Sequence, residues 1–362
     1  MTAPAPRPGI LDIAPYVPGK SSAAGHAKPI KLSSNEGALG PSPRALEAYA
    51  KAAGELHRYP DGACEALRAA IGRRFGLDPA RIVCGAGSDE LIALLVKSYA
   101  GPGDEVLFSQ YGFLMYPLAA LAAGATPVKA PERDWRTDVD ALLAGAGPKT
   151  KLCFVANPNN PTGTYIPATE LKRLRDGLPA HALLVVDAAY AEYVSRNDYG
   201  DGADLVAARD DVVMTRTFSK IFALGGMRLG WCYGPPAVID ALNRVRGPFN
   251  VSSAAQAAGI AALEDLSFAD RSRAHNDVWL PWLMRELEAL GLEVPESVGN
   301  FALARFPGGA EQAEAANAHL AADGIIARMV GAYGLPEHLR ITVGTEAEMR
   351  ATVASLKRFL AP

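Results

Sequence analysis

The sequence predicts an α/β protein with a mostly parallel sheet that helices cover on both faces. Residues 182–186 read ALLVV, a continuous apolar run of the kind found in strands buried on both sides. Similar apolar runs at 82–84, 106–108, 151–155 and 212–214 alternate with segments of helical periodicity. Alternating strands and helices are typical of a doubly covered parallel sheet.

Composition sets bounds on the function. The 362 residues are 49% hydrophobic and 21% charged, which indicates a soluble globular protein with more than one domain. A net charge of -3 gives no basic field for nucleic acid or for an anionic membrane. The first ten residues, MTAPAPRPGI, lack the apolar segment of a signal peptide, and no run is long enough to span a bilayer. Four widely spaced cysteines favour reduced thiols, no metal site and a cytoplasmic protein.

The chain begins with an arm rich in Pro, Gly, Ser and Ala, up to about residue 31. Within it, Tyr16 lies between two prolines, and the string LSSNE at 32–36 follows it. A helix is expected from residues 41–43, and a turn at 58–62 precedes a second helix. We expect an arm with part of a small domain over 1–43, a large domain over 44–250 and a small C-terminal domain over 251–362.

A turn with two glycines joins the first apolar strand to a helix. It reads GAGSDE over 85–90 and leads into a helix that runs to about Tyr99. Free backbone N–H groups and the helix dipole make such a turn an anion site. The string is neither a Walker A loop nor a G-x-G-x-x-G fingerprint, so the sequence predicts a phosphate here without naming its carrier.

Two further strands end in polar loops. NPNNPTG at 157–163 follows the strand at 151–155, and Asp187 ends the strand at 182–186. Ligands of open α/β sheets bind at the carboxyl ends of the strands, where Asp187 is expected to lie.

Lys220 lies in the string TFSKIFALGGMRLG at 217–230, among small and apolar residues. Partial burial lowers the pKa of a lysine and lets it form a Schiff base with an aldehyde. Thr217, Ser219 and Arg228 offer two hydroxyls and a guanidinium, which suit a phosphate dianion. An aldehyde that carries a phosphate is pyridoxal 5'-phosphate, which we therefore expect as the cofactor.

This string resembles the lysine signature of fold-type I pyridoxal-phosphate aminotransferases, and its detail is similar to the histidinol-phosphate aminotransferase branch. The resemblance covers nearly the whole chain and implies an aspartate-aminotransferase-like fold, with a large sheet domain and a smaller α+β domain. It implies that Lys220 carries the internal aldimine and that Asp187 pairs with the pyridine nitrogen. It also implies that Asn160 and Tyr190 bond the phenolic oxygen of the cofactor.

The same resemblance assigns the remaining cofactor contacts. Phe113, in the string FLMY at 113–116, is the expected stacking residue, with Tyr111 as its rival. Tyr59, in the string RYPDG, implies a homodimer, because this tyrosine reaches the cofactor phosphate of the neighbouring subunit in the family. The phosphate positions within one subunit are Gly87, Ser88, Asp89, Thr217, Ser219 and Arg228.

Substrate contacts are also implied by the resemblance. LRITVGT at 339–345 resembles the family's carboxylate-binding motif and assigns Arg340 to it. Tyr16, Asn35, Tyr116 and Arg328 complete the expected set. The family string Asn-Glu-Asn-Pro is here NEGA, so no role is carried beyond Asn35.

The expected activity is a ping-pong transamination between histidinol phosphate and 2-oxoglutarate, which gives imidazole acetol phosphate and glutamate in histidine biosynthesis. An aromatic amino acid aminotransferase is the nearest alternative. A threonine-phosphate decarboxylase is a second alternative, because it shares the fold and the phosphate pocket. A cofactor-binding regulator would need a DNA-binding module, and the chain has no basic segment for one.

Overall fold

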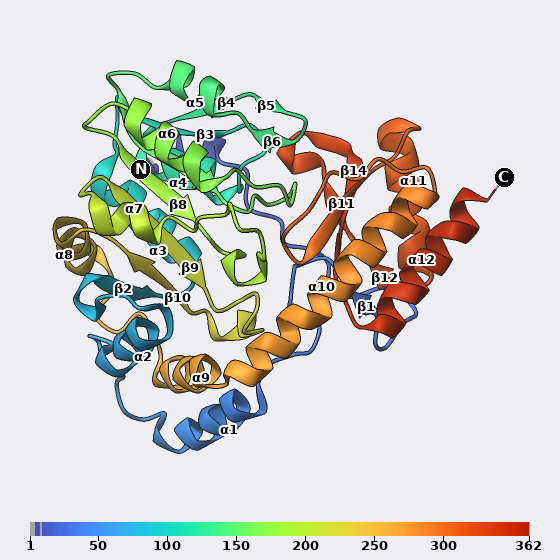
Figure 1. Ribbon diagram of the computed structural model, residues 1–362, viewed down its shortest axis with the longest axis horizontal. Helices are drawn as coiled ribbons and strands as arrows, with labels where there is room; N and C mark the ends of the chain where they lie inside the picture. The colour runs from blue at the N-terminus through green and yellow to red at the C-terminus, as the bar shows by residue number, and fades with distance from the viewer. Residues whose placement is uncertain (1–3, 8, 362) are drawn as a thin grey trace.

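A seven-stranded sheet forms the centre of the larger of two lobes in the computed structural model, which describes residues 4–7 and 9–361 (Figure 1). β10 is antiparallel to both of its neighbours, and every other adjacent pair is parallel, as the apolar runs predicted. Across the sheet the strands are β2 (Ile82–Gly85), β10 (Gly230–Tyr233), β9 (Val212–Thr217), β8 (Leu183–Asp187), β7 (Thr150–Ala156), β3 (Glu105–Ser109) and β4 (Thr126–Ala130).

Helices cover both faces of this sheet, and each face has its own hydrophobic cluster. Successive residues of β8 alternate between the clusters: Leu184 and Val186 belong to one, Leu183 and Val185 to the other. Both sides of the strand are therefore buried, which explains the continuous apolar run. One face carries α2 (Glu65–Phe75), α5 (Val139–Gly145), α6 (Ala168–Gly177), α7 (Ala203–Ala208) and α9 (Ser253–Glu264); the other carries α3 (Ser88–Tyr99), α4 (Met115–Ala123) and α8 (Pro236–Val245).

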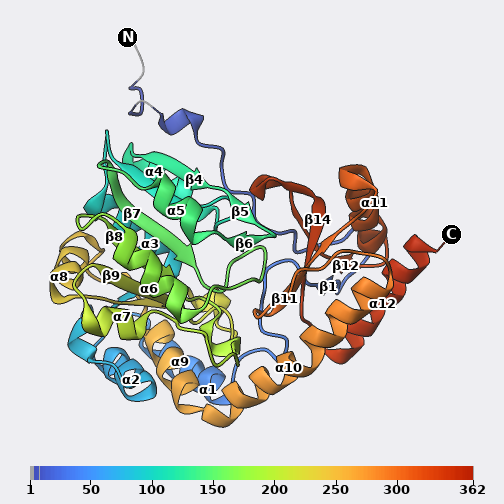
Figure 2. The ribbon, with the colours of Figure 1, turned by 45° about the horizontal axis from the view of Figure 1, so that its top comes forward.

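The smaller lobe is an α+β unit built on a three-stranded antiparallel sheet (Figure 2). Its strands are β11 (Phe301–Arg305), β14 (Leu335–Thr342) and β13 (Arg328–Val330), packed against α10 (Leu266–Ala289), α11 (Gly309–Ala322) and α12 (Glu346–Leu360). The N-terminal arm joins this lobe, because β1 (Ile30–Lys31) pairs in parallel with β12 (Ile325–Ile326). The remaining segments are the helix α1 (Pro43–Ala52), the hairpin of β5 (Glu132–Arg133) and β6 (Arg136–Thr137), and the 3-10 turns η1 (Ile10–Asp12), η2 (Ala53–Glu55), η3 (Pro79–Arg81), η4 (Ala191–Tyr193), η5 (Gly225–Met227) and η6 (Gly331–Tyr333).

The long helix α10 links the two lobes (Figures 1 and 2). The expected start of the small domain at residue 251 stays a prediction. Because α9 packs against α1 and α2 while α10 contacts both α9 and α12, we propose that the division falls within α10.

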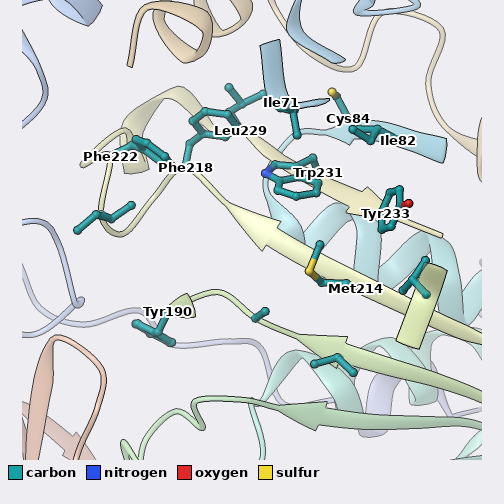
Figure 3. Close-up of a cluster of buried hydrophobic side chains, with 14 of the residues drawn as sticks. Ile71, Ile82, Cys84, Tyr190, Met214, Phe218, Phe222, Leu229, Trp231 and Tyr233 are labelled. Carbon is teal, nitrogen blue, oxygen red and sulfur yellow. The ribbon is translucent and has the colours of Figure 1, made fainter. Parts of the chain in front are cut away.

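A dense part of the core supports the segment that follows β9. Ile71, Phe218, Leu229 and Trp231 belong to one buried cluster (Figure 3). The backbone of Phe218 donates to the carbonyl of Leu229, so the two ends of the lysine loop are held together. All four cysteines are buried and unpaired. Among the described residues, no helix combines the length and the apolar character that crossing a membrane requires.

Candidate active site

A cavity of about 400 Å³ brings together most of the residues selected from the sequence. It is bounded by the N-terminal arm, by the carboxyl ends of β7, β8 and β9, by the start of α3 and by the small-lobe strands β13 and β14. The predicted residues that line it are Tyr16, Asn35, Ser88, Asp89, Phe113, Asn160, Asp187, Tyr190, Thr217, Ser219, Lys220, Arg228, Arg328 and Arg340.

Lys220 enters the cavity from the loop after β9. Its Nζ donates to the carbonyl oxygen of Ser34 at 3.2 Å and lies 5.5 Å from the ring centre of Tyr190. Burial, and then the positive charge of Arg340, lower the pKa of Lys220 from 10.5 to about 7. A large fraction of this amine is therefore neutral, and able to act as a nucleophile, near neutral pH.

Asp187 ends β8 with its side chain 4% exposed. Its Oδ2 accepts a hydrogen bond from Tyr116 Oη at 2.8 Å, and its Oδ1 accepts one from Thr215 Oγ1 at 3.3 Å. Burial raises the pKa of Asp187, while both hydrogen bonds act in the opposite direction by favouring the carboxylate.

Tyr116 does not line the cavity, in contrast to the predicted substrate contact. It lies on the first turn of α4 and is 0% exposed. Its ring stacks on Phe154 with centres 4.6 Å apart, so its hydroxyl reaches Asp187 from within the protein. The string FLMY identified this tyrosine as a candidate. It could not predict where the side chain points, because that depends on how α4 packs against the sheet.

An anion cradle lies at the start of α3. Gly87 precedes the helix with φ of +93°, and a Cβ there would overlap the side chains of Asp89 and Arg228. Arg228 Nη2 donates to Asp89 Oδ1 at 2.7 Å, and its Nη1 lies 3.4 Å from Ser219 Oγ. The dipole of α3, hydroxyl groups and a guanidinium therefore face one region of the cavity, as phosphate binding requires.

Arg340 and Asn35 both line the cavity, and each is held by hydrogen bonds within the protein. Arg340, 5% exposed on β14, donates to the carbonyl of Ser33 at 2.7 Å and to Asn160 Oδ1. Asn35 Nδ2 donates to Tyr190 Oη at 2.8 Å. The Nε atom of Arg340 is buried without a hydrogen-bond partner among the described residues.

The N-terminal arm closes one side of the cavity. Arg328 Nη2 donates to the carbonyl of Val17 at 2.7 Å, and this contact ties β13 to the arm. Tyr16 lines the cavity beside that contact. Between the two rivals for ring stacking, Phe113 lines the cavity and Tyr111 does not.

Tyr59 lies outside the cavity. Its side chain is 83% exposed, and its ring stacks on Phe249 with centres 4.7 Å apart. Within one subunit it contributes nothing to the site.

Several lining residues were missed by the sequence analysis. Ser34 and Glu36 flank Asn35, and Met115 lies between Phe113 and Tyr116, so proximity to predicted residues was the available signal.

The departure from the family string at Gly37 has a steric reason: a Cβ there would lie 2.8 Å from that of Ala223 in the lysine loop.

The residues fit pyridoxal 5'-phosphate. The cradle at α3 suits its phosphate, the buried carboxylate of Asp187 suits a protonated ring nitrogen, and Lys220 lies in the same cavity as both.

Comparisons with known proteins agree with this geometry. Residues 27–356 match the family described as aminotransferase class I and II. The chain is 61% identical to the histidinol-phosphate aminotransferase of Paramagnetospirillum magneticum over 361 residues, and 61% identical to that of Rhodospirillum centenum over 360, with 99% of each chain covered. The crystal structure of histidinol-phosphate aminotransferase from Sinorhizobium meliloti in complex with pyridoxal-5'-phosphate superposes with a TM-score of 0.92 at 30% identity, covering 99% of this chain and 98% of that one. An aspartate aminotransferase from Thermus thermophilus with maleate, 22% identical, shares the fold with a TM-score of 0.81 and 91% of both chains covered.

Proposed function

The chain belongs to the family of class I and II aminotransferases, and we propose that it transfers an amino group between histidinol phosphate and 2-oxoglutarate with pyridoxal 5'-phosphate as cofactor. The products are imidazole acetol phosphate and glutamate. One observation carries the proposal: a lysine whose pKa is lowered to about 7, a buried carboxylate and an anion cradle share one cavity. The names and the high identity of the relatives support the choice of substrate.

The residues that line the cavity suggest how the ring and the phosphate of the cofactor would be held. Asp187 would bond the ring nitrogen, and Phe113 would fix the plane of the ring, since both line the cavity. Asn160 and Tyr190 would hold the phenolic oxygen, and the phosphate would be held by Gly87, Ser88, Asp89, Thr217, Ser219 and Arg228. When bound, pyridoxal 5'-phosphate supplies an aldehyde for amines and a ring that withdraws electrons from the substrate's reacting carbon.

Lys220 is the proton carrier. Its Nζ amine takes the proton from the carbon that bears the substrate's amino group, and returns a proton as the amino group is exchanged. This function needs an amine that is neutral in part and protonated in part, which a pKa of about 7 provides. The carbonyl of Ser34 orients the amine by accepting one of its hydrogen bonds.

The substrates carry different anions, a phosphate in histidinol phosphate and two carboxylates in glutamate. One anion pocket must therefore serve both half-reactions, with Arg340 as its main cation and Arg328 at the arm assisting it. Tyr16 and Asn35 line the same cavity and provide neutral polar groups. Because Arg340 is already held by Ser33 and Asn160, it meets the substrate without reorganisation.

A homodimer is part of the proposal. The exposed rings of Tyr59 and Phe249 stack on each other at the surface, and Leu56 is exposed nearby in the chain. A second copy would bury these apolar groups and let Tyr59 reach the partner's phosphate cradle.

Half-reactions followed by cofactor absorbance test the proposal. Histidinol phosphate, phenylalanine and threonine phosphate are offered separately to the loaded enzyme, and 2-oxoglutarate is then added to complete the cycle. We expect histidinol phosphate to be converted fastest. Conversion of phenylalanine but not of histidinol phosphate would overturn the substrate, and release of carbon dioxide from threonine phosphate would overturn the reaction class.

A further inference from the structure

Tyr116 has a place in the structure that its sequence position did not indicate. It is fully buried, and its phenolic oxygen lies 2.8 Å from Asp187 Oδ2. Asp187 itself lines the cavity, so Tyr116 lies on the protein side of this carboxylate. The hydroxyl of this tyrosine therefore acts on the cavity only through Asp187.

Aromatic packing fixes the direction of this hydroxyl. The ring of Tyr116 is nearly parallel to that of Phe154, with 16° between the planes and 4.6 Å between the centres. Phe113 meets the same ring edge-on with centres 6.0 Å apart, and the ring of Phe108 is tilted by 60° with its centre also 6.0 Å away. A ring held by three neighbours has little freedom to move its hydroxyl away from the carboxylate.

Both oxygens of Asp187 receive protein donors. Tyr116 bonds Oδ2, and Thr215 on the neighbouring strand bonds Oδ1 at the longer distance of 3.3 Å. A protonated carboxyl group would itself have to donate, so donors on both oxygens favour the ionised form. They oppose the effect of burial, which is the largest influence on the pKa of Asp187 and raises it.

We propose that Tyr116 is a positioning residue that keeps Asp187 ionised and oriented toward the ring nitrogen of the cofactor. This inference rests on the proposed function, because it takes the pairing of Asp187 with that nitrogen as given. Tyr116 also touches Phe113, the proposed stacking residue, so one buried ring supports two of the groups that hold the cofactor ring.

The test compares two ligands of the apoenzyme. One is pyridoxal 5'-phosphate, and the other is its analogue in which carbon replaces the pyridine nitrogen. Their dissociation constants are measured by fluorescence titration for the wild type and for Tyr116→Phe. Tyr99→Phe is the matched control, since Tyr99 is a half-buried tyrosine of α3 that does not line the cavity.

We expect the wild type and Tyr99→Phe to bind the natural cofactor more tightly than the analogue. In Tyr116→Phe that preference should fall by about tenfold, because a hydrogen bond to a charged group is lost. Binding of the analogue should change much less, since it lacks the nitrogen that Asp187 bonds. Cofactor affinity should fall at low pH as Asp187 becomes protonated. In Tyr116→Phe this fall should occur at higher pH, because losing a hydrogen-bond donor raises the pKa of the carboxyl group.

Two outcomes would overturn the inference. If Tyr116→Phe keeps the wild-type preference and pH profile, the hydroxyl does not act through Asp187. If the wild type itself fails to prefer the natural cofactor, the pairing of Asp187 with the nitrogen is wrong, and the proposed function loses that contact independently of Tyr116. Thr215→Val provides a second variant should Tyr116→Phe not fold, and its longer bond predicts a smaller loss of preference in the same direction.

Discussion

Replacing Lys220 by methionine in the apoenzyme tests the electrostatic environment of the site. The pKa of Lys220 falls from 10.5 to about 7 in the folded protein, chiefly through burial. The unfolded chain keeps this lysine protonated up to about pH 10.5, whereas the folded protein releases the proton near pH 7. Unfolding therefore takes up a proton between these values, and the contribution of Lys220 to the free energy of unfolding rises with pH across that window.

The size of the effect follows from linkage. Each pH unit in the window changes the free energy of unfolding by about 1.4 kcal/mol per proton, so the change from pH 7 to pH 9 is about 2 kcal/mol. Lys220 is half-buried and faces a cavity, and solvent screening reduces the figure to about 1 kcal/mol. Lys220→Met removes this pH-dependent contribution. The free energy of unfolding of the variant minus that of the wild type should therefore fall by about 1 to 2 kcal/mol between pH 7 and pH 9.

Urea unfolding of both apoproteins at equal protein concentration measures the difference, since association also affects apparent stability. Lys97→Met, which removes an exposed lysine of α3, reports the effect of losing a lysine as such. A difference between Lys220→Met and the wild type that stays constant from pH 7 to pH 9, or that widens, would refute the assigned environment.

The other predictions concern the loaded enzyme. Lys220→Ala should lose turnover and the absorbance of the lysine-bound cofactor, and retained turnover would exclude Lys220 as the reactive amine. Gly87→Ala should weaken cofactor binding by about tenfold or more, because its φ is +93° and its Cβ would displace Arg228; Gly101→Ala, which has open space, should bind normally. Arg340→Lys should raise the KM for glutamate by about tenfold or more in steady-state kinetics, because a lysine cannot replace a guanidinium held by two acceptors, whereas the exposed Arg350→Lys should not. Mixing Tyr59→Ala and Lys220→Ala subunits should restore about a quarter of wild-type activity through one complete site per mixed dimer, and no recovery would argue against a shared site.

Much of the large lobe was predictable because its signals are local. A strand buried on both faces needs an unbroken apolar run, as β8 has. The start of α3 at Ser88 lies within the turn at 85–90, so neighbouring residues of the chain were enough to indicate it. The packing partner of α9 was harder to predict. Its sequence, SAAQAAGIAALE, is small and apolar around much of its circumference, so no single face indicates which lobe it contacts. Gly259 permits its close approach to Leu229 and Leu67 in the large lobe.

Within the site, the resemblance identified candidate residues along the chain but did not indicate which of them reach the cavity. Tyr116 and Phe113 lie in one short string, yet only Phe113 reaches the cavity. Tyr116 lies on the first turn of α4 and packs against Phe154 in the sheet, which depends on contacts distant in sequence. Glu36 was not selected because the chain departs from the family string at the next residue, although its side chain lines the cavity and pairs with Lys31 at 2.7 Å.

The charges around Lys220 also explain why burial decides its pKa. Arg340 and Arg228 lower the pKa, while Glu36 and Asp187 raise it, so the two cations are partly offset by the two carboxylates. An anion bound to either arginine removes part of the lowering influence and favours the protonated amine. Burial is the larger cause and is not removed by that anion, because a ligand in the cavity excludes more water from Nζ. The amine can therefore alternate between its two protonation states while the cavity is filled, as a group that both accepts and returns a proton must.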